Sequence, residues 1–196
     1  MHELGNTFLS KDFNSNRFRE LNNVINFVKG KKPNNINETK VEGRLKYLTI
    51  ACLNGQELNY ADIGKSVITK NDILMVMDGA SSGDVYYSDY GIVGSTLSKI
   101  DIVDDNYIDG FIYFCFKKYN KIIKDRNTGS AIPHTDKAFV GNLKIPIINK
   151  EEQFKYKELL LKINQNLKEN SLLEQLRDTL LPKLMNGKID LNNIII

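Results

Sequence analysis

Apolar residues after position 150 fall at the spacing of one long helix. Residues 151–181 contain neither Gly nor Pro and are rich in Glu, Lys, Gln and Leu, which are strong helix formers. The apolar positions alternate four- and three-residue steps, as in a coiled-coil seam. The predicted seam consists of Tyr156, Leu160, Ile163, Leu167, Asn170, Leu173, Leu176 and Leu180, with a phase slip after Asn170. An isolated amphipathic helix of about 45 Å, at ~1.5 Å per residue, buries such a stripe only against a partner.

Two residues mark the expected end of this helix. Pro182 is expected to kink or end it, because proline lacks the backbone N–H that a helix interior needs. Gly187 is expected to cap the turn after Pro182, since glycine accepts the left-handed conformation common at the end of a helix.

Before position 150, short apolar runs alternate with turn residues, which predicts strands rather than long helices. The runs are rich in β-branched and aromatic residues, and pairs such as Asn54-Gly55 and Asp78-Gly79 separate them. Strands are predicted at 45–51, 66–69, 72–77, 84–87 and 95–103. Neighbours this close along the chain favour antiparallel or mixed pairing, because parallel strands need longer connections.

Two further segments have helical spacing. The first is predicted to form a helix over 18–29, followed by the stop signals Gly30 and Pro33. The second predicts a helix from 107 to 119, then a polar loop over 124–136 and a short strand before Pro146. The expected fold is α/β (α+β), with a mixed, mostly antiparallel sheet and flanking helices in residues 1–148. The long spacer helix and a tail occupy residues 149–196.

Composition narrows the class of protein. A length of 196 residues suits one domain with an appendage, and 41% hydrophobic with 26% charged residues is typical of soluble proteins. The net charge of +3 permits a polyanionic partner without requiring one. Cys52 and Cys115 have no metal-type spacing and are expected to be buried, reduced thiols, with a disulfide left open. Without a signal core or a long apolar run, we expect a cytoplasmic protein that is not membrane-bound.

Three segments, in order, carry a family resemblance: LNNVINFVKGKKP (21–33), TGSAIPHTDKAFVGNLKIPIINKEEQ (128–153) and LRDTLLPKLMNGKIDL (176–191). They resemble the opening, the exit segment and the spacer-helix end of Type I restriction-modification specificity subunits. The resemblance implies a non-catalytic subunit that binds double-stranded DNA at a bipartite target. It also implies partners, the methyltransferase and restriction subunits, which carry the S-adenosylmethionine and ATP chemistry.

A typical member of that family has two recognition domains and two spacer helices, whereas this sequence has one of each. It therefore resembles a half-subunit, and we expect a homodimer joined by an antiparallel coiled coil. Pairing with a different half-subunit is left open. The alternative function is a partner-binding scaffold or inhibitor subunit that does not bind DNA itself.

Candidate DNA contacts are basic or polar residues in loops. Lys29, Lys31 and Lys32 flank Gly30, and a second basic run comprises Lys117, Lys118, Lys121, Lys124 and Arg126. Such residues neutralise phosphates, although solvated helix ends look the same in sequence. Thr128, Gly129, Ser130 and His134 offer donors in one loop. Ser81, Ser82, Tyr86 and Tyr87 are further candidates, because the resemblance places their region near DNA.

Signals for catalysis are weak in this sequence. No phosphate loop, cofactor-binding glycine motif or methyltransferase Asn-Pro-Pro-Tyr motif occurs. A Ser130–His134 pair is an open hydrolase alternative, but no nucleophile elbow accompanies it. Asp101, Asp104 and Asp105 fit a solvated turn, with a metal site as the alternative. We expect no catalytic residue, no metal and no cofactor.

Overall fold

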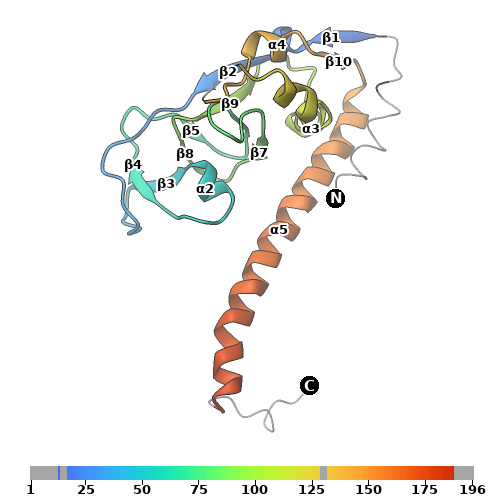
Figure 1. The fold of residues 1–196 in the computed structure, drawn as a ribbon. Helices are drawn as coiled ribbons and strands as arrows, with labels where there is room; N and C mark the ends of the chain where they lie inside the picture. Colours follow the sequence, from blue (N-terminus) through green and yellow to red (C-terminus); the bar gives the residue numbers. More distant parts are fainter. Residues whose placement is uncertain (1–12, 14–16, 129–131, 188–196) are drawn as a thin grey trace. The chain divides into compact units, whose positions relative to one another are not determined.

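The computed structural model describes residues 13, 17–128 and 132–187. Contacts divide the chain into two compact units, Met1–Lys157 and Glu158–Ile196. Figure 1 shows the path of the chain. In chain order, its helices and strands are β1 (Phe18–Glu20), η1 (Leu21–Asn23), β2 (Ile25–Lys29), β3 (Arg44–Leu48), α2 (Ile50–Leu53), β4 (Tyr60–Asp62), β5 (Ile68–Thr69), β6 (Ile73–Val76), β7 (Val85–Tyr87), β8 (Gly91–Val93), β9 (Leu97–Ile102), α3 (Asp109–Asp125), α4 (Lys137–Gly141), β10 (Lys144–Pro146) and α5 (Lys150–Met185).

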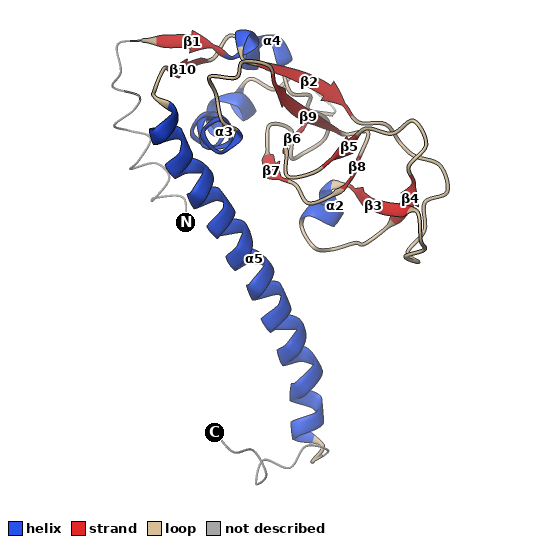
Figure 2. Cartoon of the chain, turned by 180° about the vertical axis from the view of Figure 1, so that it is seen from behind, coloured by secondary structure: helices blue, strands red, loops and turns tan. Residues whose placement is uncertain are grey.

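The first unit contains two four-stranded sheets and a short two-stranded ribbon (Figure 2). One sheet has the order β2-β9-β6-β7, and each of its neighbouring pairs is antiparallel. The other has the order β4-β3-β8-β5, in which β3 and β8 are parallel. The ribbon pairs β1 with β10 in antiparallel register. The prediction of a mixed, mostly antiparallel sheet fold with flanking helices is therefore confirmed.

A buried apolar cluster joins the two sheets. Leu74, Val76 and Leu97 contribute from the first sheet, and Leu48 and Val93 from the second. Each of these side chains is at most 2% exposed, and full burial of such a side chain stabilises a fold by roughly 1.5–3 kcal/mol. The cluster therefore holds the strands rigidly beneath the loops that leave their ends.

The predicted helix over 18–29 is wrong, because this segment forms β1, a single 3-10 turn and β2. Leu21, Val24 and Ile25 are buried, which is why their spacing imitates a helical face. The residues after them pair with β9, with Phe27 opposite Ile100. Short apolar runs fit either element, and here the available sheet edge decided the outcome.

The other predicted elements are confirmed with shifted bounds. The predicted strands overlap β3, β5, β6, β7 and β9, whereas β4 and β8 were not predicted. The predicted strand over 45–51 ends at Leu48, because the Thr49 hydroxyl accepts a hydrogen bond from the Cys52 N–H and starts α2. The helix predicted over 107–119 is α3, and it continues to Asp125.

The long C-terminal helix is confirmed as α5, Lys150–Met185. Pro182 lies inside it and does not end it, since the helix continues to Met185. Gly187 has a φ of +64°, and its N–H donates to the Leu184 carbonyl, as expected of a helix cap. The predicted domain boundary at 148/149 stays a prediction; the two compact units divide inside α5, after Lys157.

Two smaller expectations can be compared with the coordinates. Cys52 and Cys115 are free thiols, with Cys115 buried and Cys52 half-buried. Within residues 13, 17–128 and 132–187, no helix is long and apolar enough to cross a membrane.

Candidate nucleic-acid interface

Several loops meet at one end of the β2-β9-β6-β7 sheet, where β2 and β6 finish and β7 and β9 begin. The Gly30 N–H donates to the Leu97 carbonyl at 2.9 Å, and the Met77 N–H donates to the Thr96 carbonyl at 2.8 Å. We call this region, residues 29–32, 77–84, 94–97, 126–128 and 132–135, the loop end of the sheet. It contains most of the DNA-binding residues that the sequence predicts.

The backbone at Gly30 lies close to the backbone at Gly94. This contact positions the lysines that flank Gly30. A Cβ on Gly30 would lie 2.1 Å from the Gly94 carbonyl oxygen, so no larger residue fits there. This approach joins the end of β2 to the turn between β8 and β9. Lys29, Lys31 and Lys32 are all exposed around it, as a phosphate-binding group requires.

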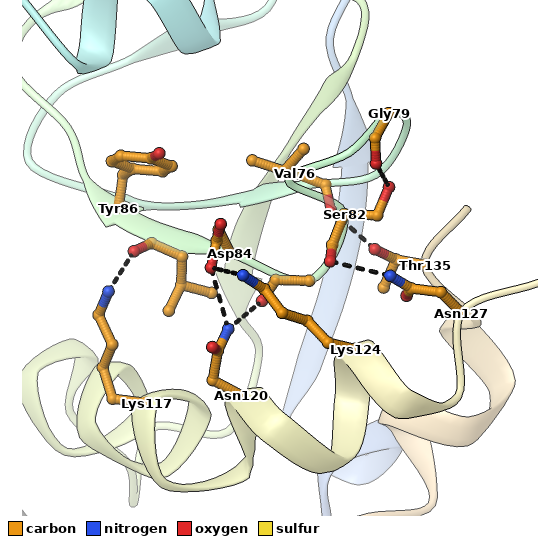
Figure 3. A network of polar contacts seen from close by, with 12 residues as sticks. Val76, Gly79, Ser82, Asp84, Tyr86, Lys117, Asn120, Lys124, Asn127 and Thr135 are labelled. Carbon is orange, nitrogen blue, oxygen red and sulfur yellow. Dashed lines mark hydrogen bonds and ion pairs between the residues drawn. The ribbon is translucent and has the colours of Figure 1, made fainter. Parts of the chain in front are cut away.

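Side chains of α3 hold the loop between β6 and β7, and the first residue of β7, in place (Figure 3). Lys117 Nζ donates to the Val85 carbonyl at 2.8 Å, and Asn120 Nδ2 donates to the Gly83 carbonyl at 2.8 Å. Lys124 Nζ pairs with the Asp84 carboxylate at 2.7 Å. Burial lowers the pKa of Lys117. Two lysines of the predicted second basic run therefore face this loop.

Ser82 is a structural residue of the same loop. Its side chain is fully buried, and its single hydroxyl proton is shared between the carbonyls of Gly79, at 2.7 Å, and Pro133, at 2.8 Å. Its own carbonyl accepts from Asn127 Nδ2 at 3.0 Å. We therefore leave Ser82 out of the proposed DNA surface, while Ser81 beside it is half-exposed.

The segment after α3 is tied to the same loop. Thr128 and His134 exchange backbone hydrogen bonds of 2.9 and 2.7 Å. Thr135 donates from its N–H to the Met77 carbonyl and from its hydroxyl to the Val76 carbonyl, at 2.8 and 2.7 Å. These bonds place Thr128 and His134, both exposed, at the loop end. The predicted contacts Gly129 and Ser130 lie outside the described residues.

His134 has a partner that the sequence interpretation missed. Its Nδ1 lies 2.7 Å from Asp78 Oδ1, and its side chain is still 51% exposed. Asp78 lies just beyond β6 and precedes Gly79, which has a φ of +102°. The Asp-Gly pair after a buried strand was the available signal, but the pair predicts only a turn.

The remaining two predicted DNA contacts differ in exposure. Arg126 follows α3, is exposed, and lies 5.5 Å from the centre of the Phe139 ring. Tyr86 on β7 is half-buried, and its hydroxyl donates to Asn54 Oδ1 at 3.1 Å. Burial raises the pKa of Tyr86, so it stays a neutral hydroxyl.

The first turns of α5 are anchored within the first unit. Gln153 is 1% exposed, and its side chain accepts from the Ile108 N–H and donates to the Asn106 carbonyl, both at 2.8 Å. Lys157 binds the Asp109 carboxylate and, at 2.6 Å, the Tyr87 hydroxyl. Burial opposes the charged form of Lys157, but these two partners outweigh it and raise its pKa.

The predicted dimerisation residues divide into two groups along α5. Tyr156 is 5% exposed and packs against the rings of Phe111 and Phe114, and Leu160 is fully buried. Tyr156, which lies in the first unit, is therefore covered without a second molecule. The remaining positions are half-exposed or exposed, namely Ile163, Leu167, Asn170, Leu173, Leu176 and Leu180.

The metal-site alternative gains no support at the residues described, and the Ser130–His134 alternative stays a prediction because Ser130 lies outside them. Asp101 pairs with Lys99 at 2.7 Å, and Asp104 pairs with Arg19 at 2.9 Å. Within residues 13, 17–128 and 132–187, no three His, Cys, Asp or Glu side chains gather as a metal site would require.

Comparison with known proteins gives a consistent assignment. Residues 14–177 match the family described as "Type I restriction modification DNA specificity domain". The chain is 29% identical over 143 residues to the "Type I restriction enzyme MjaVIII specificity subunit" of Methanocaldococcus jannaschii. That alignment covers 71% of this chain and 34% of the relative, so the chain spans about a third of that protein.

Two solved structures have a similar fold. The S subunit of a Type I restriction-modification system from M. genitalium superposes with a TM-score of 0.64 at 21% identity, over 87% of this chain and 46% of that one. The HsdS subunit from Thermoanaerobacter tengcongensis gives 0.60 at 18% identity, over 95% of this chain and 51% of that one. At these identities the likeness concerns the fold, while the family match covers most of this sequence. The chain therefore belongs to the Type I restriction modification DNA specificity domain family.

Proposed function

We propose that this chain binds duplex DNA sequence-specifically through the loop end of the sheet. The observation that carries the proposal is the gathering there of accessible cations and donors from distant parts of the sequence. The residues are Lys29, Lys31, Lys32, Ser81, Arg126, Thr128 and His134. Cations neutralise phosphates, and loops on a rigid sheet hold polar groups where base edges can be read.

We also propose a role for the chain among other subunits, and this proposal rests on its family. As a specificity component, the chain brings separate methyltransferase and restriction subunits to a bipartite target and carries no catalytic group itself. The names of three similar proteins support this role: a Type I restriction enzyme specificity subunit from M. jannaschii, the S subunit of a Type I restriction-modification system from M. genitalium, and the HsdS subunit from T. tengcongensis.

Selection from a random duplex library tests DNA binding directly. We expect the chain, alone or with the methyltransferase subunit of its host, to enrich one defined sequence. We also expect its affinity to fall steeply with salt, because bound phosphates release counterions. A chain that binds the methyltransferase subunit but enriches no sequence, even in that complex, would instead be the scaffold or inhibitor of the alternative interpretation.

We further propose that the outer part of α5 pairs with the same helix of a second copy. The α5 stripe, defined as Leu173, Leu176 and Leu180, carries the argument. Leu173 and Leu176 are 55% and 53% exposed. A coiled-coil partner covers leucines at this spacing, and antiparallel pairing of two copies yields a two-fold symmetric reader of a split palindrome.

Replacing Leu173 and Leu176 with Glu should convert a dimer into a monomer, because two charges cannot enter an apolar seam. Sedimentation equilibrium measures the change. The control is the double variant Ser171→Glu and Gln175→Glu, which adds the same charge on the opposite side of α5 and should remain dimeric. A wild-type chain that is monomeric at high concentration would refute the pairing of two copies.

A further inference from the structure

The Asp78–His134 pair fixes which ring nitrogen of His134 carries a proton. An ionised carboxylate only accepts hydrogen bonds, so the 2.7 Å contact requires His134 Nδ1 to donate to Asp78 Oδ1. In the neutral ring, Nε2 then has a lone pair and no proton. In that neutral form, Nε2 of the half-exposed His134 side chain is therefore a hydrogen-bond acceptor.

The backbone on both sides of His134 is immobilised. Pro133 accepts from the Gly79 N–H at 2.9 Å and from the buried Ser82 hydroxyl at 2.8 Å. Thr135 is 7% exposed and is bound twice to the end of β6. His134 itself exchanges two backbone hydrogen bonds with Thr128. Its ring is thus held on a rigid frame, as a group that must recognise a ligand requires.

The Asp78–His134 contact does little for stability. The histidine is 51% and the aspartate 30% exposed, and water competes for polar contacts between groups exposed to this degree, so such a contact adds little to stability. The backbone bonds and the buried Ser82 and Thr135 hold the loop without it. The contact that orients the His134 ring is therefore not explained by the stability of the fold.

Ligand chemistry follows from the acceptor character of Nε2. Phosphate oxygens are themselves acceptors and cannot bind a bare nitrogen. In the major groove, the donors on base edges are the exocyclic amino groups, N6 of adenine and N4 of cytosine. We propose that His134 Nε2 accepts from such an amino group and that Asp78 is its positioning residue. This inference rests on the proposed DNA binding and adds a base-reading role.

The test repeats duplex selection at pH 8, where an ordinary imidazole is neutral, with wild type, His134→Ala and Asp78→Ala. We expect wild type to prefer adenine or cytosine at one position by about tenfold, the value of ~1.4 kcal/mol of discrimination. His134→Ala should lose the preference at this position and keep the preferences at all other positions. Asp78→Ala should weaken the preference at the same position. Asp105→Ala, which removes an exposed carboxylate beyond the other end of β9, should leave it intact.

A modified duplex gives a second, independent measurement. The selected base is replaced by its analogue without the amino group, purine for adenine or pyrimidin-2-one for cytosine. Wild type should bind this duplex about tenfold more weakly, whereas His134→Ala should not distinguish the two duplexes.

Three results would overturn the inference. Identical selected sequences for wild type and His134→Ala would mean that the ring contacts no base. Uniform weakening on every sequence would indicate a phosphate contact by a charged ring. Failure of the wild type to bind any duplex, even with the methyltransferase subunit present, would remove the proposed function and the base-reading role together. Thermal unfolding of each variant verifies that the loop still folds.

Discussion

Replacing Gly110 with Ala will lower the free energy of unfolding by about 3 kcal/mol, at the upper end of the range for overpacked sites. The added Cβ would lie 2.4 Å from Lys157 Cα and 2.6 Å from Lys157 N. Both obstacles are backbone atoms of α5, so no side-chain rotation relieves the clash. The first turns of α5 must move away from α3, which also separates Lys157 from Asp109.

Denaturant unfolding measures the loss, and hydrogen exchange locates it. Amides of residues 150–157 should exchange faster, while those of β6 should change least. Gly141→Ala is the matched control, because its new Cβ would meet the Asn22 side chain at 3.2 Å and come no nearer than 3.9 Å to backbone. Equal stability of the Gly110 and Gly141 variants would show that α5 tolerates displacement from α3.

The double variant Lys31→Ala and Lys32→Ala should bind every duplex sequence about tenfold more weakly or worse, since hydrogen bonds to charged groups contribute roughly 1.5–3 kcal/mol. The plot of log affinity against log salt should also become shallower by about 0.9 per lost phosphate contact. The base preference should remain, because phosphates carry no sequence information. Fluorescence anisotropy at several salt concentrations gives both quantities.

Lys70→Ala with Lys144→Ala is the matched control for that variant. Both lysines are exposed, but Lys70 precedes β6 at the opposite end of the sheet and Lys144 lies in the β1-β10 ribbon. Removing the same charge there should leave the salt dependence unchanged. If both double variants lose the same affinity, the overall charge of the chain attracts DNA and the loop end has no special part.

Much of the fold could be predicted because local patterns agreed with the tertiary structure. The content of helix formers after Lys150 predicted α5, and the alternation of apolar runs with turns predicted a mostly antiparallel sheet. The segment 18–29 failed because its apolar spacing fits a helix in isolation, while β9 offers a strand edge that the sequence does not reveal. Tyr156 continued the predicted seam, but its ring packs against Phe111 and Phe114 of its own unit, which the spacing alone does not reveal.

The candidate site was predictable by residue type and not by arrangement. Exposed lysines around Gly30 could be identified because glycine and charge mark a loop. The burial of Ser82 and the inward direction of Lys117 could not, because both depend on carbonyl groups that come within reach only after folding. Asp78 was missed for the same reason, since 56 residues separate it from His134.

Side chains of α3 and of the segment just after it bind backbone carbonyls beyond β6. This kind of contact has a consequence for how the sequence can change in evolution. Lys117, Asn120 and Asn127 bind the carbonyls of Val85, Gly83 and Ser82, groups that every amino acid possesses (Figure 3). The side chains of Ala80, which is exposed, and Ser81, which is half-exposed, are not needed for these bonds. Under the proposed DNA-binding role, mutations at those two positions can therefore alter what the loop contacts without loosening its path, so new target preferences can arise in small steps at little risk to the scaffold.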